Sequence, residues 1–121
     1  MPILTIEVVL ADDEELAPGE ARALADAAGE VLGSAPGTTW VRLRTLPRER
    51  YAESGGAPAE LLPVFVDLLL AEPPPADELP DLVAGLTAAL AGVLGRPAEN
   101  VHVLLAPPAA GRIAFGGSLR G

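Results

Sequence analysis

Short apolar runs alternate with longer amphipathic stretches along this chain of 121 residues. The opening run at 2–10, PILTIEVVL, is rich in β-branched residues and predicts a strand. After an acidic loop, apolar residues recur at spacings of three and four, which predicts a helix that begins near Ala17 or Pro18 and ends at Gly33. At 40–46 apolar residues alternate with arginines, and this period of two predicts a second strand. The first half of the chain is therefore expected to form a β-α-β unit.

The second half repeats this order of elements. A nearly continuous apolar run at 63–70 predicts a strand that is buried on both faces. An apolar stripe over 79–94 predicts a helix with Asp77 as its N-cap and Gly95 at its end. A last strand is predicted at 101–105, and each half closes with a hairpin-like tail that contains two consecutive glycines. A second β-α-β unit is thus expected.

The two halves match at an offset of sixty or sixty-one residues, which aligns Pro2 with Pro63, Val41-Arg42-Leu43 with Val101-His102-Val103, and Gly55-Gly56 with Gly116-Gly117. A single domain over 1–121 is predicted, built from pseudo-repeats 2–56 and 63–117. A crossover helix makes the two strands of each unit parallel. The predicted fold class is α+β, with a four-stranded mixed sheet and two helices on one face. The other face is expected to be apolar and to be covered by oligomerisation.

Composition limits both the chemistry and the partners. The chain has no cysteine, which excludes disulfides and thiol chemistry, and its single histidine argues against an all-protein zinc site. The net charge of −9 argues against nucleic acid and anionic membranes as partners. No apolar run is long enough to cross a bilayer, and the N-terminus lacks the basic and apolar segments of a signal peptide. A cytoplasmic protein is therefore expected.

All positive side-chain charge comes from arginine, and four arginines fall close together: Arg42, Arg44, Arg48 and Arg50. Arg42 and Arg44 share one face of the predicted strand. Because a guanidinium presents a planar fork to carboxylates, this pair fits a site for a small anion. A solvated strand edge is the alternative, since charge runs are usually solvated faces.

Pro2 directly follows the initiator methionine. Methionine aminopeptidase normally removes Met before so small a residue, which would leave Pro2 with a free secondary amine. An amide nitrogen has no available lone pair, so only an N-terminal proline can act as a base or a nucleophile. Burial and neighbouring arginines would lower the pKa of such an amine toward neutrality. The alternative is that Pro2 simply starts the strand, where proline is common.

These features together resemble the tautomerase superfamily, the group of 4-oxalocrotonate tautomerase, 5-carboxymethyl-2-hydroxymuconate isomerase, macrophage migration inhibitory factor and the 3-chloroacrylate dehalogenases. The resemblance covers essentially the whole chain. It rests on Met1-Pro2 opening a strand, the duplicated β-α-β unit, the strands TTWVRL and ENVHVLL, and the C-terminal stretch PPAAGRIAFGG. It implies a homotrimer that uses its amino-terminal proline in catalysis and needs no cofactor.

The resemblance also assigns residues. Pro2 takes the position of the family's catalytic proline, and Arg42 takes that of a substrate-binding arginine. His102 is the counterpart of Arg42 in the second half, where macrophage migration inhibitory factor has a tyrosine that reaches a neighbouring subunit's site. Tyr51 lies near the position of the tautomerase's pocket aromatic. With a second arginine on the same strand face and one in the C-terminal tail, the substrate-binding candidates are Arg42, Arg44, Tyr51, His102 and Arg112.

The sequence departs from the family in two places. Acidic residues around Asp12 stand where the tautomerase has an arginine after its first strand, and Glu72 with three prolines stands where the dehalogenases have an arginine pair. Both departures argue against a dicarboxylate substrate or dehalogenation.

The predicted function is that of a cofactor-independent tautomerase for a small 2-hydroxy-dienoate or enolpyruvate-type carboxylate. Pro2 would move the proton as general base, and arginine would bind the carboxylate and the developing enolate. Two alternatives stay open. One is a non-catalytic, oligomeric binding protein on the same scaffold, and the other is a different proline-dependent reaction: decarboxylation, hydration or dehalogenation.

Overall fold

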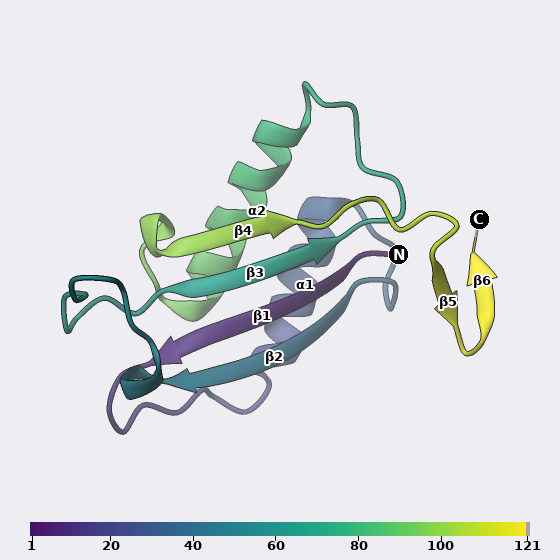
Figure 1. Cartoon of the computed structure of the whole chain (residues 1–121). Coiled ribbons are helices and arrows are strands. Elements are labelled where there is room, and N and C mark those ends of the chain that lie inside the picture. The colour runs from purple at the N-terminus through teal and green to yellow at the C-terminus, as the bar shows by residue number, and fades with distance from the viewer. Residues whose placement is uncertain (121) are drawn as a thin grey trace.

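The computed structural model describes residues 1–120 and contains a four-stranded sheet, two helices and a C-terminal hairpin (Figure 1). The sheet strands are β1 (Ile3–Leu10), β2 (Trp40–Pro47), β3 (Val64–Leu69) and β4 (Val101–Leu105). The helices are α1 (Glu20–Leu32) and α2 (Leu79–Leu94), with short 3-10 turns η1 (Arg48–Arg50) and η2 (Ala98–Asn100). The hairpin consists of β5 (Ile113–Phe115) and β6 (Ser118–Arg120).

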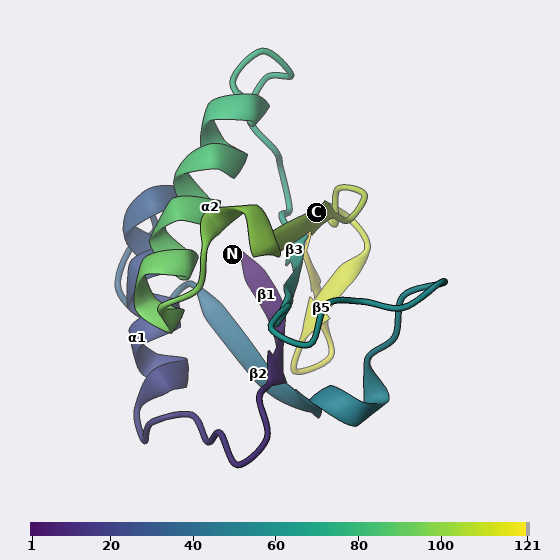
Figure 2. The same cartoon turned by 90° about the vertical axis from the view of Figure 1, so that its left-hand side faces the viewer.

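The sheet has the strand order β2-β1-β3-β4. β1 is parallel to β2, β3 is parallel to β4, and the two central strands β1 and β3 are antiparallel. Each parallel pair is joined by one helix, and both helices cover the same face of the sheet (Figure 2). The predicted α+β class, with its mixed sheet of β-α-β units, is confirmed.

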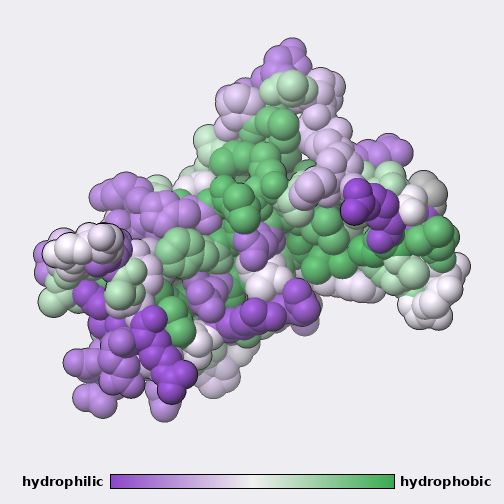
Figure 3. Space-filling model, viewed as in Figure 1, coloured by the Kyte–Doolittle hydropathy of each residue, from purple (hydrophilic) through white to green (hydrophobic). Residues whose placement is uncertain are grey.

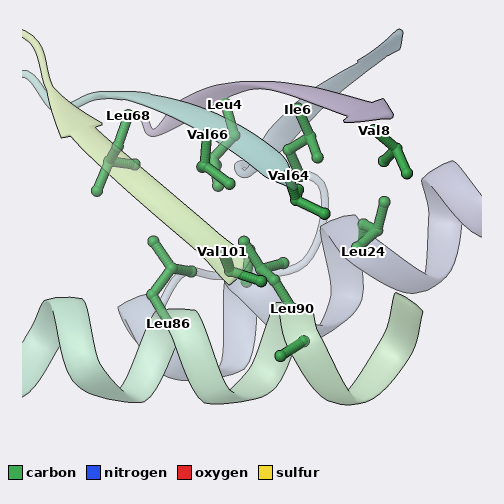
Figure 4. Close-up of a cluster of buried hydrophobic side chains, with 12 residues drawn as sticks. Leu4, Ile6, Val8, Leu24, Val64, Val66, Leu68, Leu86, Leu90 and Val101 are labelled. Carbon is green, nitrogen blue, oxygen red and sulfur yellow. The ribbon is translucent and has the colours of Figure 1, made fainter. Parts of the chain in front are cut away.

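The core lies between the sheet and the two helices. Alternate residues of the central strands point toward α1 and α2 because successive side chains of a strand face opposite sides. They are almost completely buried, as are the helix residues that meet them (Figure 4): Leu4, Ile6, Val8, Val64, Val66, Leu68, Leu24, Ala28, Leu86 and Leu90. Burial of each large aliphatic side chain contributes about 1.5–3 kcal/mol to folding.

The opposite face of the sheet is open and polar at its centre. The register places Thr5 beside Arg42 and Asp67, and Glu7 beside Arg44. Figure 3 shows hydrophilic residues across the middle of this face and hydrophobic ones toward the hairpin. The expectation of an apolar open face is therefore wrong for its centre. In β1, β2 and β3 polar residues alternate with apolar ones, and the register brings the polar residues to the same face.

β3 is buried on one face only, contrary to the prediction of burial on both. Its buried residues alternate with Phe65, which is 37% exposed, and with the exposed Asp67. The apolar run misled because Phe65 belongs to the open face, where no other element of the described chain covers it fully. A long hydrophobic run thus did not mean a central, two-sided burial here.

The predicted helix ends are confirmed, and the predicted starts are not. Gly33 and Gly95 follow α1 and α2 in left-handed conformations with φ of 64° and 66°. α1 starts later than Pro18 because Gly19, at φ 84°, turns the chain just before the first helical residue. Asp77 does not cap α2, which begins after Glu78 without any side-chain cap.

A partly buried ion pair joins the two β-α-β units. Arg96, which follows α2, donates to Glu14 Oε2 and Oε1 at 3.2 and 3.1 Å and to the Val9 carbonyl at 2.9 Å. The Arg96 side chain is only 10% exposed. Glu14 also accepts a hydrogen bond from the Ala11 N–H at 2.9 Å. The hydrogen bonds from Arg96 hold the pKa of Glu14 below its ordinary value, against the opposing effect of burial.

Candidate active site

Pro2 lies at the entrance of the central strand β1. Its carbonyl accepts a hydrogen bond from the Trp40 N–H at 3.0 Å, which fixes it to the first residue of β2. The residue is half-buried. Because β1 is paired on both sides, the backbone that carries Pro2 is held by the sheet and does not form a free tail. Such anchoring is what a terminal catalytic group requires.

Two pockets meet at this end of the sheet. The helix-end pocket, of about 530 Å³, is lined by Pro2, Leu32, Ser34, Glu72 and Leu82 among others. The hairpin pocket, of about 400 Å³, is lined mainly by Trp40, Ala109, Ile113, Phe115 and Arg120. Met1 and Ala71 line both pockets. The two pockets are therefore neighbours at Met1 and Ala71, and Pro2 lines only the helix-end pocket.

Aromatic side chains form one wall of the hairpin pocket. Trp40 and Phe115 meet edge to face with ring centroids 5.3 Å apart. The Trp40 indole N–H donates to the Gly37 carbonyl at 3.1 Å, which holds the ring in place although the residue is 43% exposed. The contact docks the hairpin on the start of β2, so the pocket depends on residues from both ends of the chain.

The arginines predicted to bind substrate lie away from Pro2 within one chain. Arg42 and Arg44 are on the open face. Pro2 lies two residues before Leu4 and therefore faces the same side of the sheet, toward the helices. Arg42 is level with Thr5, three residues or about 10 Å along the strand from Pro2, and its Nη2 donates to Thr5 Oγ1 at 2.9 Å. Neither arginine lines the helix-end pocket or the hairpin pocket.

Tyr51 and His102 belong to an aromatic row farther along the open face. The Phe65 ring is 6.0 Å from Tyr51 and 5.6 Å from His102, measured between centroids. Tyr51 donates to Glu53, and this hydrogen bond raises the pKa of the tyrosine hydroxyl. His102 is level with Phe65 and hence with Glu7, about 16 Å along the sheet from Pro2. This row and Pro2 do not share a pocket within the chain.

Arg112 lines a third, smaller pocket of about 250 Å³ beside Pro107 and Pro108. Ile113 and Ala109 line both this pocket and the hairpin pocket. Arg112 itself does not line the hairpin pocket. Arg120, which the sequence reasoning did not single out, lines the hairpin pocket instead.

Two further arginines have structural roles that sequence reasoning missed. Arg48 donates to the carbonyls of Tyr51, Ala57, Pro58 and Ala59, at 3.4, 3.5, 2.9 and 3.4 Å. It therefore holds the loop after β2 together. Arg96 forms the ion pair described above, and only its position after a helix-ending glycine could have drawn attention to it. Over residues 1–120, no group of three or more histidine or acidic side chains could hold a metal ion, and no helix is long and apolar enough to cross a membrane.

No protein-family model and no curated protein sequence matches this chain, but solved structures match it along nearly its whole length. A fused 4-OT that forms a symmetric trimer is 16% identical, with a TM-score of 0.76 over 98% of this chain and 94% of its own. Macrophage migration inhibitory factor from Trichinella spiralis is 16% identical, with a TM-score of 0.73 over 97% and 98%. The chain has the tautomerase-superfamily fold.

The same fold also occurs in a malonate semialdehyde decarboxylase, FG41, that is inhibited by 3-bromopropiolate. It is 17% identical to this chain, with a TM-score of 0.69 over 94% of this chain and 88% of its own. The resemblance seen in the sequence is therefore confirmed at the level of the tautomerase-superfamily fold. The similar structures include a fused 4-OT and a decarboxylase, so the fold alone does not determine which reaction is catalysed.

Proposed function

We propose that this protein is a cofactor-independent tautomerase that converts a small enol carboxylate, a 2-hydroxy-dienoate or an enolpyruvate, to its keto form. After removal of Met1, the Pro2 amine takes the enol proton and returns a proton to carbon as general base and acid. The observation that carries the proposal is the position of Pro2. It is fixed by the Trp40 N–H at the start of a central strand and lines a pocket of about 530 Å³.

The cations for the enolate would come from an assembly. We propose a homotrimer, in which Arg42, Arg44 and His102 on the open face of one copy approach the Pro2 end of another. Two observations support this arrangement. These residues lie on an exposed face that no described element of the chain covers, and the similarly folded fused 4-OT is a trimer. A guanidinium at the enolate oxygen would stabilise the charge that develops in the transition state.

A second candidate is a reaction that needs protonated proline, such as decarboxylation or hydration. Glu72 lines the same pocket as Pro2, and a carboxylate stabilises the protonated form of a nearby amine. A protonated proline would act as general acid or hold the substrate's carbonyl oxygen. The fold of a malonate semialdehyde decarboxylase is consistent with this alternative. A binding protein without catalysis would keep the assembly and show no dependence on the Pro2 amine.

Ketonisation of phenylenolpyruvate, a monocarboxylate enol, tests the proposal, with protein whose intact mass shows that Met1 is absent. Pro2→Ala should lower kcat/KM by about 10²-fold or more, the contribution expected of a general base. The same protein with an uncleaved N-terminal extension keeps Pro2 but blocks its amine, and it should be equally inactive. Light scattering should give three times the 12.3 kDa chain mass for all three proteins.

The outcomes separate the candidates. No enol turnover, together with decarboxylation of malonate semialdehyde that Pro2→Ala abolishes, would replace the tautomerase by the second candidate. Absence of any reaction that needs the free amine would leave the binding-protein alternative. A monomeric mass for the unmodified protein would reject the assembled site.

A further inference from the structure

We propose that the hairpin pocket holds the planar, apolar end of a monocarboxylate, and that Arg120 binds the carboxylate. The inference rests on the proposed function only where this monocarboxylate is taken to be the substrate of the reaction at Pro2. The ligand class follows from three properties of the pocket, which are its aromatic wall, its single cation and its position beside Met1.

The hairpin register places Arg120 in the pocket. β5 and β6 are antiparallel, and Ile113 pairs with Arg120 while Phe115 pairs with Ser118. Directly paired residues lie on the same face of a hairpin, so Ile113, Phe115 and Arg120 share one face. Leu119 lies on the other face and is 66% exposed. The consecutive glycines between the strands, with φ of 59° and 88°, form the tight turn that fixes this register.

The pocket walls favour a flat apolar group. Trp40 and Phe115 pack edge to face against each other in the wall, and Ile113 with alanines completes it. A volume of about 400 Å³ lies within the range of small-molecule sites. Apolar walls with a single charged side chain are the usual construction of such sites, because the apolar walls supply affinity and the polar group fixes orientation.

The charges in the pocket favour one carboxylate. Arg120 is the only charged side chain among the described residues that line the hairpin pocket, and no described carboxylate is within ion-pair distance of it. A guanidinium binds a carboxylate through two parallel hydrogen bonds. The second carboxylate of a dicarboxylate would lie against an apolar wall without a partner, which costs free energy. Within one chain, the hairpin pocket therefore offers a cation to one carboxylate only, in agreement with the missing arginine near Asp12.

The position of the pocket connects it to Pro2. Met1 lines both the hairpin pocket and the helix-end pocket, whose wall includes Pro2. With Met1 removed, a ligand whose carboxylate is held by Arg120 lies in the space next to the terminal amine. Arg120 thus supplies from the same chain the carboxylate contact that Arg42 and Arg44 do not make within that chain.

Binding can be measured without catalysis, because Trp40 is the only tryptophan and lines the pocket. The probes are trans-cinnamate, cinnamyl alcohol and trans,trans-muconate, titrated against the tryptophan fluorescence of protein that lacks Met1. Cinnamate should quench the fluorescence and bind more tightly than muconate. Arg120→Gln should weaken cinnamate binding about tenfold or more, as expected for loss of a charge-assisted bidentate contact, and leave cinnamyl alcohol unchanged.

Arg22→Gln is the matched control. Arg22 pairs with Asp26 on the surface of α1, does not line the hairpin pocket, and its loss changes the net charge equally. Phe115→Leu should weaken the acid and the alcohol alike, because it reduces the aromatic wall. If Arg120→Gln and Arg22→Gln bind cinnamate equally, or if equilibrium dialysis detects no cinnamate binding, the inference is overturned.

The inference and the proposed function fail separately. Cinnamate binding that depends on Arg120, in a protein without any Pro2-dependent turnover, would reject the tautomerase and keep the monocarboxylate site. Turnover of phenylenolpyruvate that depends on Pro2 but shows the same KM with Arg120→Gln would keep the tautomerase and reject the role of Arg120.

Discussion

The two β-α-β units share a topology and differ at the residue that opens each unit. Pro2 is half-buried and lines a pocket, whereas its counterpart Pro63 is less than 2% exposed and its carbonyl accepts from the Val9 N–H at 3.1 Å. Since β1 and β3 are antiparallel, the two prolines lie at opposite ends of the sheet. The two units thus share a topology, but the proline that opens the first unit is partly accessible and the one that opens the second is buried.

The tails that follow the two units account for this difference. The sequence predicts a hairpin-like tail for each, but only 113–120 forms one. The first tail stays a loop because Arg48 binds its carbonyls, and because Pro58 has no N–H to donate to a ladder. The second tail docks Phe115 on Trp40 and encloses the hairpin pocket. The residues that follow the second β-α-β unit therefore build part of the pocket at the Pro2 end of the sheet.

The largest expected effect comes from exchanging each proline for alanine. Pro2→Ala should remove about 10²-fold or more of the turnover, because no other residue can supply a terminal secondary amine. Pro63→Ala should lower the free energy of unfolding and leave kcat per folded molecule unchanged. Enzyme assays alongside urea denaturation of both variants check the comparison. Equal loss of turnover per folded molecule would show that the two ends are functionally alike.

The core should respond equally in the two units. Leu24 of α1 and Leu86 of α2 are both fully buried between helices and sheet. Leu24→Ala and Leu86→Ala should each lower the free energy of unfolding by about 2–5 kcal/mol, through lost burial and the cavity left behind. Urea denaturation monitored by circular dichroism measures both. A cost below about 1 kcal/mol for one variant would mean that its repeat is not packed as described, since surface substitutions have effects of that size.

The ion pair between Glu14 and Arg96 joins the two units, and its contribution to the free energy of unfolding should depend on pH. Glu14→Gln should cost about 1.5–3 kcal/mol at pH 7, the usual value of a hydrogen bond to a charged group. Because the pKa of Glu14 is depressed in the folded state, this stabilisation is complete above the carboxyl's ordinary value of 4.5 and is lost as the pH falls below it. Urea denaturation from pH 7 to pH 3 should therefore show the two proteins converging in acid. If the difference in free energy of unfolding between the unmodified protein and Glu14→Gln stays constant across this range, the ionic contribution of the pair is contradicted.

Much of the fold follows from periodicity, and much of the site does not. Alternation in β1 and β2 and the apolar stripes of both helices were enough to predict the sheet and its helix layer. Burial of β3 was predicted wrongly because an apolar run does not say what covers each face, as Phe65 shows. Pro2 could be predicted as the catalytic residue because its position in the chain alone gives it chemistry, and that role stays a prediction. Arg120 was missed because its place depends on the hairpin register, although the paired glycines before it carried that signal.

The glycine pairs of the two tails give the smallest and most specific test. Gly117 and Gly56 both adopt left-handed conformations, with φ of 88° and 98°, and a Cβ at either position would meet no other atom. Gly117→Ala and Gly56→Ala should therefore each cost only about 1–2 kcal/mol, the strain of a side chain in that region. Only Gly117→Ala should weaken cinnamate binding, because it disturbs the turn that sets the register of Arg120 and Phe115. Tryptophan fluorescence titrations of both variants measure this, and equal binding would mean that the pocket does not depend on the hairpin.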